Sequence, residues 1–157
     1  MATETKTRTV THASFTIERR FRQPPARVFK AFASEASKQA WFHGPEEWGR
    51  DVHQMDFRVG GRETSVGGPP GGPVSSFRAI YQDIVPDQRI IFSYDMDLDG
   101  TEISVSLTTI ELRPDGAGTH LVYTEQGAYL DGWDKPDGRE EGTRDLFDNL
   151  AHYLDQN

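Results

Sequence analysis

The C-terminal segment carries the pattern that most constrains the fold of this chain. Its apolar side chains recur at helical spacing, and they are Leu146, Phe147, Leu150, Ala151 and Leu154. Charged residues occupy the opposite side, so the pattern predicts an amphipathic helix over about Gly138–Asp155 with one apolar face to bury. Asp137 and Glu140 have the spacing of a capping box, which predicts the beginning of this helix. A glycine inside it, Gly142, indicates a close contact with a sheet or a groove beside the helix.

The sequence before this helix is patterned mainly as β-strands. Phe15, Ile17, Arg19 and Phe21 alternate with polar residues, which is the period of a strand. Pro24 and Pro25 end that strand and favour two short helices, the second capped by Ser34 and running over Glu35–Trp41. Further strands are expected at 51–59, Val74–Val85, Arg89–Met96, Glu102–Leu112 and Thr119–Gln126. Asp99-Gly100 is a strong hairpin signal between two of them.

This order of elements predicts an α+β domain. A meander of about six or seven strands needs a cover for its apolar face, and the C-terminal helix is the expected cover. A twisted antiparallel sheet curls around such a helix, and a cavity can form between them. We expect residues 1–12 to be a flexible tail and residues 13–157 to form one domain.

Composition excludes several classes of function. The 157 residues include no cysteine, which excludes disulfides, thiolate metal sites and a cysteine nucleophile, and is compatible with a cytoplasmic location. The formal net charge of −8 disfavours a nucleic-acid partner. No run approaches the ~18 apolar residues of a membrane helix, so no membrane span is expected.

Motifs for cofactors, metals and covalent catalysis are missing from the sequence. Asp95, Asp97 and Asp99 imitate the start of a calcium loop, but Ser106 stands where the loop needs a glutamate. The five histidines show no metal-binding spacing. The sequence therefore predicts no metal, no cofactor and no catalytic residue. The segment Gly67–Pro73 is expected to be a mobile loop, and a gate for the cavity is one hypothesis for it.

Aromatic side chains and one carboxylate are the candidates for the cavity wall. These ligand-binding candidates are Trp41, Phe57, Phe77, Tyr81, Phe92, Tyr94, Tyr123, Glu125, Trp133 and Phe147. Strand alternation places Glu125 on the same side as Leu121 and Tyr123, at or near the cavity mouth, where it could act as an acid, a base or a ligand anchor. The alternative is a structural ion pair with an arginine such as Arg144, or simple exposure at the strand end.

Six segments together resemble a known family. They are Ile17–Phe32, Trp41–Phe42, Phe57–Gly61, Ile84–Ile90, Tyr123–Tyr129 and Arg139–Leu150. Their order and spacing, over about residues 13–155, are similar to those of the START/birch-allergen (SRPBCC) superfamily, in the branch named after the activator of the heat-shock-protein-90 ATPase. The resemblance implies the helix-grip fold, in which a curved antiparallel sheet wraps around a long C-terminal helix.

The resemblance leaves three functions open. Members bind lipids, hormones or polyketides, others act as cyclases or hydrolases, and the namesake stimulates a chaperone. We expect a binding module for a small apolar or amphipathic molecule. The first alternative is a cyclase- or hydrolase-like enzyme that uses Glu125 or a cavity tyrosine. The second is a chaperone-activator-like role on the outer sheet face, which is less expected because the namesake's separate N-terminal domain is not found in this sequence.

Overall fold

Alternating buried and exposed side chains build one seven-stranded antiparallel sheet in the computed structural model, which describes residues 7–49 and 51–157. The strands are β1 (Val10–Phe21), β2 (Val52–Met55), β3 (Arg62–Gly67), β4 (Ser75–Val85), β5 (Arg89–Leu98), β6 (Thr101–Asp115) and β7 (Gly118–Leu130). Their order across the sheet is β1-β7-β6-β5-β4-β3-β2. The helices are α1 (Pro25–Ala33), α2 (Glu35–Trp41), the 3₁₀ helix η1 (Glu46–Trp48) and α3 (Pro136–Gln156).

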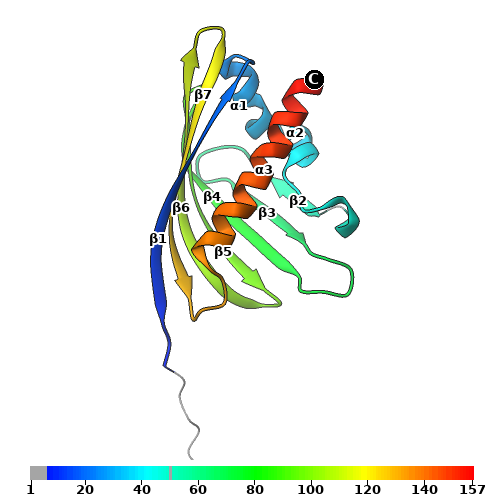
Figure 1. Cartoon of the computed structure of the whole chain (residues 1–157), viewed down its shortest axis with the longest axis vertical. Helices are drawn as coiled ribbons and strands as arrows, with labels where there is room; N and C mark the ends of the chain where they lie inside the picture. The colour runs from blue at the N-terminus through cyan, green and yellow to red at the C-terminus, as the bar shows by residue number, and fades with distance from the viewer. Residues whose placement is uncertain (1–6, 50) are drawn as a thin grey trace, which may run out of the picture.

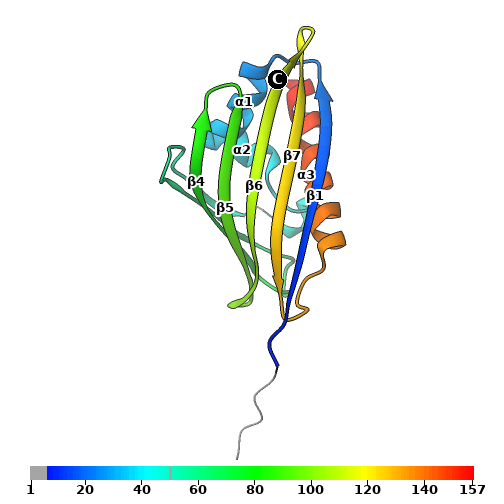
Figure 2. The same cartoon turned by 90° about the vertical axis from the view of Figure 1, so that its left-hand side faces the viewer.

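The long helix α3 lies along the concave face of the sheet. Figure 1 shows α3 crossing this face, with α1 and α2 near the end where α3 finishes. Figure 2 shows the opposite face of the sheet, with β4 to β7 and β1 side by side and no helix in front of them. The predicted α+β helix-grip fold, with two short helices after the first strand, is therefore confirmed.

The apolar core lies between the inner sheet face and the helices. It combines side chains of β1, such as Ile17, with Leu121 of β7 and with Phe147, Leu150 and Leu154 of α3. The apolar stripe read from the C-terminal sequence is therefore the face that α3 buries, as expected for an amphipathic helix that covers a sheet.

The first strand extends into the segment predicted to be a tail. β1 pairs with β7 from Val10 opposite Leu130 to Phe21 opposite Thr119. The six N-terminal residues of the predicted tail lie outside the described residues. After β1, Pro25 opens α1, and the side chain of Ser34 accepts a hydrogen bond of 3.3 Å from the Ser37 amide, which confirms the predicted cap of α2.

Several predicted boundaries are wrong. The strand expected at 51–59 ends at Met55, because residues 56–61 form a turn in which Gly60 adopts a φ of 84°. The capping box at Asp137 is not used. Helix α3 has Lys135 as its N-cap, without a side-chain cap, and begins at Pro136, whose ring favours the first helical position. The hairpin at Asp99-Gly100 is confirmed, since both residues have positive φ values of 50° and 82°.

Candidate functional site

A cavity of about 1020 Å³ lies between the inner sheet face and α3. Six of the ten predicted site residues line it: Trp41, Phe77, Phe92, Tyr94, Tyr123 and Phe147. They come from α2, from the strands β4, β5 and β7, and from α3. Two helices and three strands therefore contribute aromatic side chains to the cavity lining.

The remaining four predicted residues lie elsewhere. Phe57 packs edge-on against Tyr81 at 4.9 Å between ring centroids, beside the cavity wall rather than in it. Trp133 is 57% exposed in the turn before α3. Glu125 is 0% exposed, on the inner sheet face. Neither Glu125 nor the other three are among the residues that line the cavity, and a role for them in binding stays a prediction.

Two glycines of α3 leave one side of the cavity open. Gly138 and Gly142 both line it, one helical turn apart. A Cβ atom added to either glycine would meet no other atom within 4 Å. The groove expected beside Gly142 is therefore present, whereas a close helix–sheet contact at this position is not.

Helix α2 contributes an anchored aromatic wall. The Trp41 indole N–H donates a hydrogen bond of 2.9 Å to the Ala31 carbonyl, and its ring packs edge-on against Phe32 at 5.0 Å. An indole with a satisfied N–H and two fixed neighbours is a rigid apolar surface. The same helix turns Lys38 toward this wall, one turn before Trp41 in the sequence.

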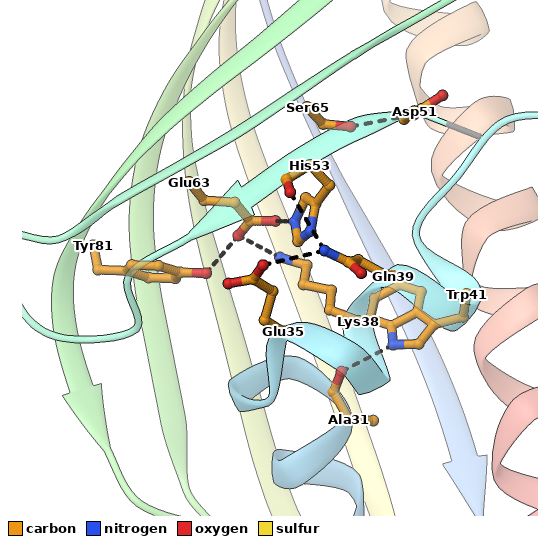
Figure 3. Close-up of polar contacts among 10 residues, drawn as sticks. All are labelled: Ala31, Glu35, Lys38, Gln39, Trp41, Asp51, His53, Glu63, Ser65 and Tyr81. Atoms are coloured by element: carbon orange, nitrogen blue, oxygen red, sulfur yellow. Dashed lines mark hydrogen bonds and ion pairs between the residues drawn. The ribbon is translucent and has the colours of Figure 1, made fainter.

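Lys38 belongs to a buried polar cluster that also contains Glu63, His53 and Tyr81 (Figure 3). The Lys38 ammonium donates to Glu63 Oε1 at 2.6 Å. His53 Nε2 lies 2.8 Å from Glu63 Oε2, and the Tyr81 hydroxyl donates to Oε1 of the same carboxylate. Side chains of four elements thus meet at the Glu63 carboxylate: α2, β2, β3 and β4.

The surroundings of Glu63 keep its carboxylate ionised. Burial disfavours the charge, but the Lys38 ammonium and the hydrogen bonds from His53, Lys38 and Tyr81 outweigh burial and lower the pKa of Glu63 to about 2. Burial and the same carboxylate raise the pKa of Tyr81, so its hydroxyl stays a donor. Sequence reasoning missed Lys38, His53 and Glu63, although the i, i+3 spacing of Lys38 and Trp41 was a usable signal.

A second polar cluster is centred on Glu125. The Tyr94 hydroxyl donates to Oε2 at 2.8 Å, and the Tyr123 hydroxyl donates to Oε1 at 2.6 Å. Arg139 Nη1 lies 3.6 Å from Oε2 and donates a hydrogen bond of 2.9 Å to the Tyr94 oxygen. The predicted alternative, a structural ion pair between Glu125 and an arginine, is present, but the arginine is Arg139. Arg144, the suggested partner, instead pairs with Glu140 at 2.8 Å.

Arg139 connects this cluster to the rim of the cavity. Its Nη2 donates to Ser104 Oγ at 2.7 Å and to Asp134 Oδ2 at 2.8 Å. Burial and the Glu125 carboxylate raise the pKa of both Tyr94 and Tyr123, so both phenols remain protonated. Because each phenol proton is donated to Glu125, these two hydroxyls offer a ligand only oxygen lone pairs.

The two clusters share one arrangement. Lys38, Tyr94, Tyr123 and Arg139 line the cavity, whereas the carboxylates that they contact, Glu63 and Glu125, do not. Each buried carboxylate is therefore separated from the cavity by its own donors. This geometry fixes the lining side chains and keeps the carboxylates of Glu63 and Glu125 out of direct reach of a bound molecule.

The described residues show neither a metal centre nor a membrane helix. Within 7–49 and 51–157, no group of three or more histidine, cysteine, aspartate or glutamate side chains is arranged to hold a metal ion. In the same ranges, no helix is both long enough and apolar enough to cross a membrane.

Solved structures with the same fold come from several bacteria. A protein from Rhizobium leguminosarum is 39% identical, with a TM-score of 0.92, and the match covers 97% of this chain and 100% of that chain. A protein from Rhizobium loti is 51% identical, with a TM-score of 0.86 and coverage of 92% and 99%. An AHSA1-like protein from Aeromonas hydrophila shares the fold at 19% identity and a TM-score of 0.71, with coverage of 92% and 93%.

Comparison with protein families gives a match over most of the chain, whereas comparison with curated proteins gives none. The family model described as "Activator of Hsp90 ATPase homolog 1-like protein" matches residues 22–155, which include every residue of the two polar clusters. The resemblance read from the sequence is thereby confirmed, and the chain belongs to the activator of Hsp90 ATPase homolog 1-like family.

Proposed function

We propose that this protein binds a small apolar or amphipathic molecule in the cavity between the sheet and α3. The observation that carries the proposal is the cavity itself, whose volume of about 1020 Å³ is that of a site for a drug-sized ligand. Most of its wall area is apolar, aromatic side chains contribute to it from several elements, and hydrogen bonds hold polar groups such as Lys38 and Arg139 in fixed positions. This combination is typical of small-molecule sites. The proposal includes a cytoplasmic location, as the cysteine-free sequence suggests.

The composition of α3 supports the same proposal. Glycine costs about 1 kcal/mol relative to alanine inside a helix. Two glycines stand at Gly138 and Gly142, where a methyl group would meet nothing. Packing does not explain them, but access to the cavity does, because any larger side chain at these positions narrows the opening.

The enzyme alternative has less support from the geometry. Of the groups predicted for this alternative, Glu125 is buried behind Tyr94 and Tyr123, and the cavity tyrosines Tyr94 and Tyr123 already donate their protons to Glu125. A bound molecule would have to displace a tyrosine to reach it. The chaperone-activator alternative would use the outer sheet face, where Val105 and Leu107 are exposed. Stoichiometric recovery of the chaperone with the purified protein would favour that alternative over cavity binding.

Native mass spectrometry of the freshly purified protein tests the proposal. We expect a bound molecule, or else a rise in melting temperature with members of a panel of lipids and aromatic compounds. A clean mass of the unliganded protein, together with no thermal shift across the panel, would contradict cavity binding.

A pair of α3 variants locates the binding. Gly142→Leu narrows the cavity, and we expect it to weaken binding at least about tenfold, equivalent to about 1.4 kcal/mol. Glu141→Leu is the matched control, because it adds the same side chain at an exposed position outside the cavity lining. Equal loss of binding in both variants would show that the ligand does not enter beside Gly142.

A further inference from the structure

Lys38 is an unusual residue for the wall of an aromatic cavity. Its side chain lines the cavity, yet the residue is only 4% exposed. Lysine is rarely buried to this degree unless it is paired. The pairing is supplied by Glu63, at 2.6 Å from the ammonium nitrogen.

The ion pair uses only part of what the ammonium can donate. A lysine ammonium has three N–H donors. Within residues 7–49 and 51–157, the hydrogen-bond acceptor found for the Lys38 ammonium is Glu63 Oε1. The ammonium also lies 4.7 Å from the ring centroid of Phe42 and 5.8 Å from that of Phe92. A cation–π contact is weaker than a charge-assisted hydrogen bond, so an oxygen acceptor in the cavity would bind better at this ammonium than the rings do.

Glu63 holds the Lys38 ammonium in position but does not itself face a ligand in the cavity. The carboxylate is outside the cavity lining and is held from two further directions by His53 and Tyr81. The ion pair therefore orients Lys38 in advance, which reduces the entropy lost when a ligand binds.

Tyr94, Tyr123 and Arg139 line the same cavity but differ from Lys38 in what they can donate to a ligand. Tyr94 and Tyr123 donate their protons to Glu125 and can only accept. Arg139 is a donor, but it already contacts Tyr94, Ser104 and Asp134 at the α3 end. The Lys38 ammonium lies beside the Phe42 and Phe92 rings, and Phe42 packs edge-on against Phe77 at 5.3 Å.

From this juxtaposition we infer that Lys38 selects the ligand, and that the ligand is an aromatic molecule whose carbonyl or carboxylate oxygen accepts a hydrogen bond from the Lys38 ammonium. The inference rests on the proposed function and adds the chemical class. The rings contact the aromatic part of the molecule, and Lys38 contacts its oxygen. A hydrocarbon of the same shape lacks the second interaction.

Three naphthalene probes of similar size test the inference by calorimetric titration. They are 2-acetonaphthone, which carries a carbonyl, 2-naphthoate, which carries a carboxylate, and 2-ethylnaphthalene, which carries neither. We expect one or both oxygen-bearing probes to bind about tenfold more tightly than the hydrocarbon, as a charged hydrogen bond would provide. The stronger of the two identifies whether the natural group is a neutral carbonyl or an anion.

A double variant assigns the preference to Lys38. Lys38→Met with Glu63→Gln removes the ammonium and avoids an unpaired buried carboxylate. We expect this variant to bind all three probes about equally. Lys30→Met is the control, because Lys30 is an exposed lysine outside the cavity lining and its replacement is expected to leave the preference intact.

The infrared carbonyl band of bound 2-acetonaphthone reports the hydrogen bond directly. In the unmodified protein we expect a lower stretching frequency than in an apolar solvent, and this readout needs no variant to fold. Equal binding of the ketone, the acid and the hydrocarbon would overturn the inference and leave cavity binding standing, and so would tighter binding of the ketone with an unshifted carbonyl band. No binding of any probe would contradict both.

Discussion

Glu63 shows at the scale of single residues how the structure differs from what the sequence predicts. Its partner Lys38 precedes it by 25 positions and stands on a helix, while Glu63 stands on a strand. Periodicity assigns each residue to an element but does not say which helix turn faces which strand. The Lys38–Glu63 pair therefore could not be predicted, whereas the inward direction of Glu125, which follows from alternation along one strand, could.

Removing the charge of Glu63 is expected to destabilise the protein strongly. Glu63→Gln leaves the buried Lys38 ammonium without a counter-charge, and breaking such a pair typically costs about 3–5 kcal/mol. Urea denaturation at pH 7 measures the loss in the free energy of unfolding. A loss below about 1 kcal/mol would show that the pair contributes little.

The same residue predicts a pH dependence. The pKa of Glu63 is about 2 in the folded protein, below the ordinary glutamate value of 4.5, so as the pH falls this carboxylate is protonated in the unfolded chain before it is protonated in the folded protein. The stabilisation by Glu63 is complete above about pH 4.5 and is lost as the pH falls toward 2. The stability difference between the unmodified protein and Glu63→Gln should therefore shrink between pH 5 and pH 3 in urea denaturation. A constant difference would contradict the assignment.

At the scale of helices and strands, the sequence predicts the structure more accurately than it predicts the buried polar pairs. The alternating strands, the Ser34 cap and the Asp99-Gly100 hairpin depend on local chemistry, and the structure contains all three. The errors occur where two local signals compete. At α3, the capping spacing of Asp137 competes with the ring of Pro136, and the proline determines where the helix begins.

Two glycine-to-alanine substitutions test two different roles of glycine, one inside a helix and one at a turn position with positive φ. Gly142→Ala places a methyl group in open space inside α3, so we expect stabilisation by about 0.4–1 kcal/mol. Gly100→Ala forces a side chain onto a φ of 82°, and we expect destabilisation by about 1–2 kcal/mol. Thermal unfolding of the two variants measures both signs. Destabilisation by Gly142→Ala would indicate that α3 packs more closely than the structure shows.

At the scale of the whole molecule, the helix-grip arrangement was predictable because only one segment could cover the sheet. The size of the cavity was not, since it depends on how far the aromatic side chains fill the space between sheet and helix. The volume of about 1020 Å³ indicates that Phe77, Phe92 and Phe147 line the space without closing it.

Ligand binding should stabilise the entire domain. A probe at about 100 times its dissociation constant adds about 2.7 kcal/mol to the free energy of unfolding. For a chain of this length, that corresponds to a rise in melting temperature of about 5–10 °C. We expect this rise with 2-acetonaphthone in the unmodified protein and about half of it or less in Gly142→Leu at the same concentration, because tenfold weaker binding leaves about 1.4 kcal/mol. An equal rise in both would place the binding outside the cavity.

Methyl-labelled NMR titration with 2-acetonaphthone tests the central claim most directly, because it shows on which side of the sheet a ligand binds. Ile110, Met96 and Leu146 line the cavity, whereas Val105 and Leu107 lie on the outer face with exposures of 46% and 40%. Binding between sheet and helix predicts saturable shifts of the first three methyl signals and none of the last two. Shifts at Val105 and Leu107 alone, or no shifts at any of the five, would contradict it.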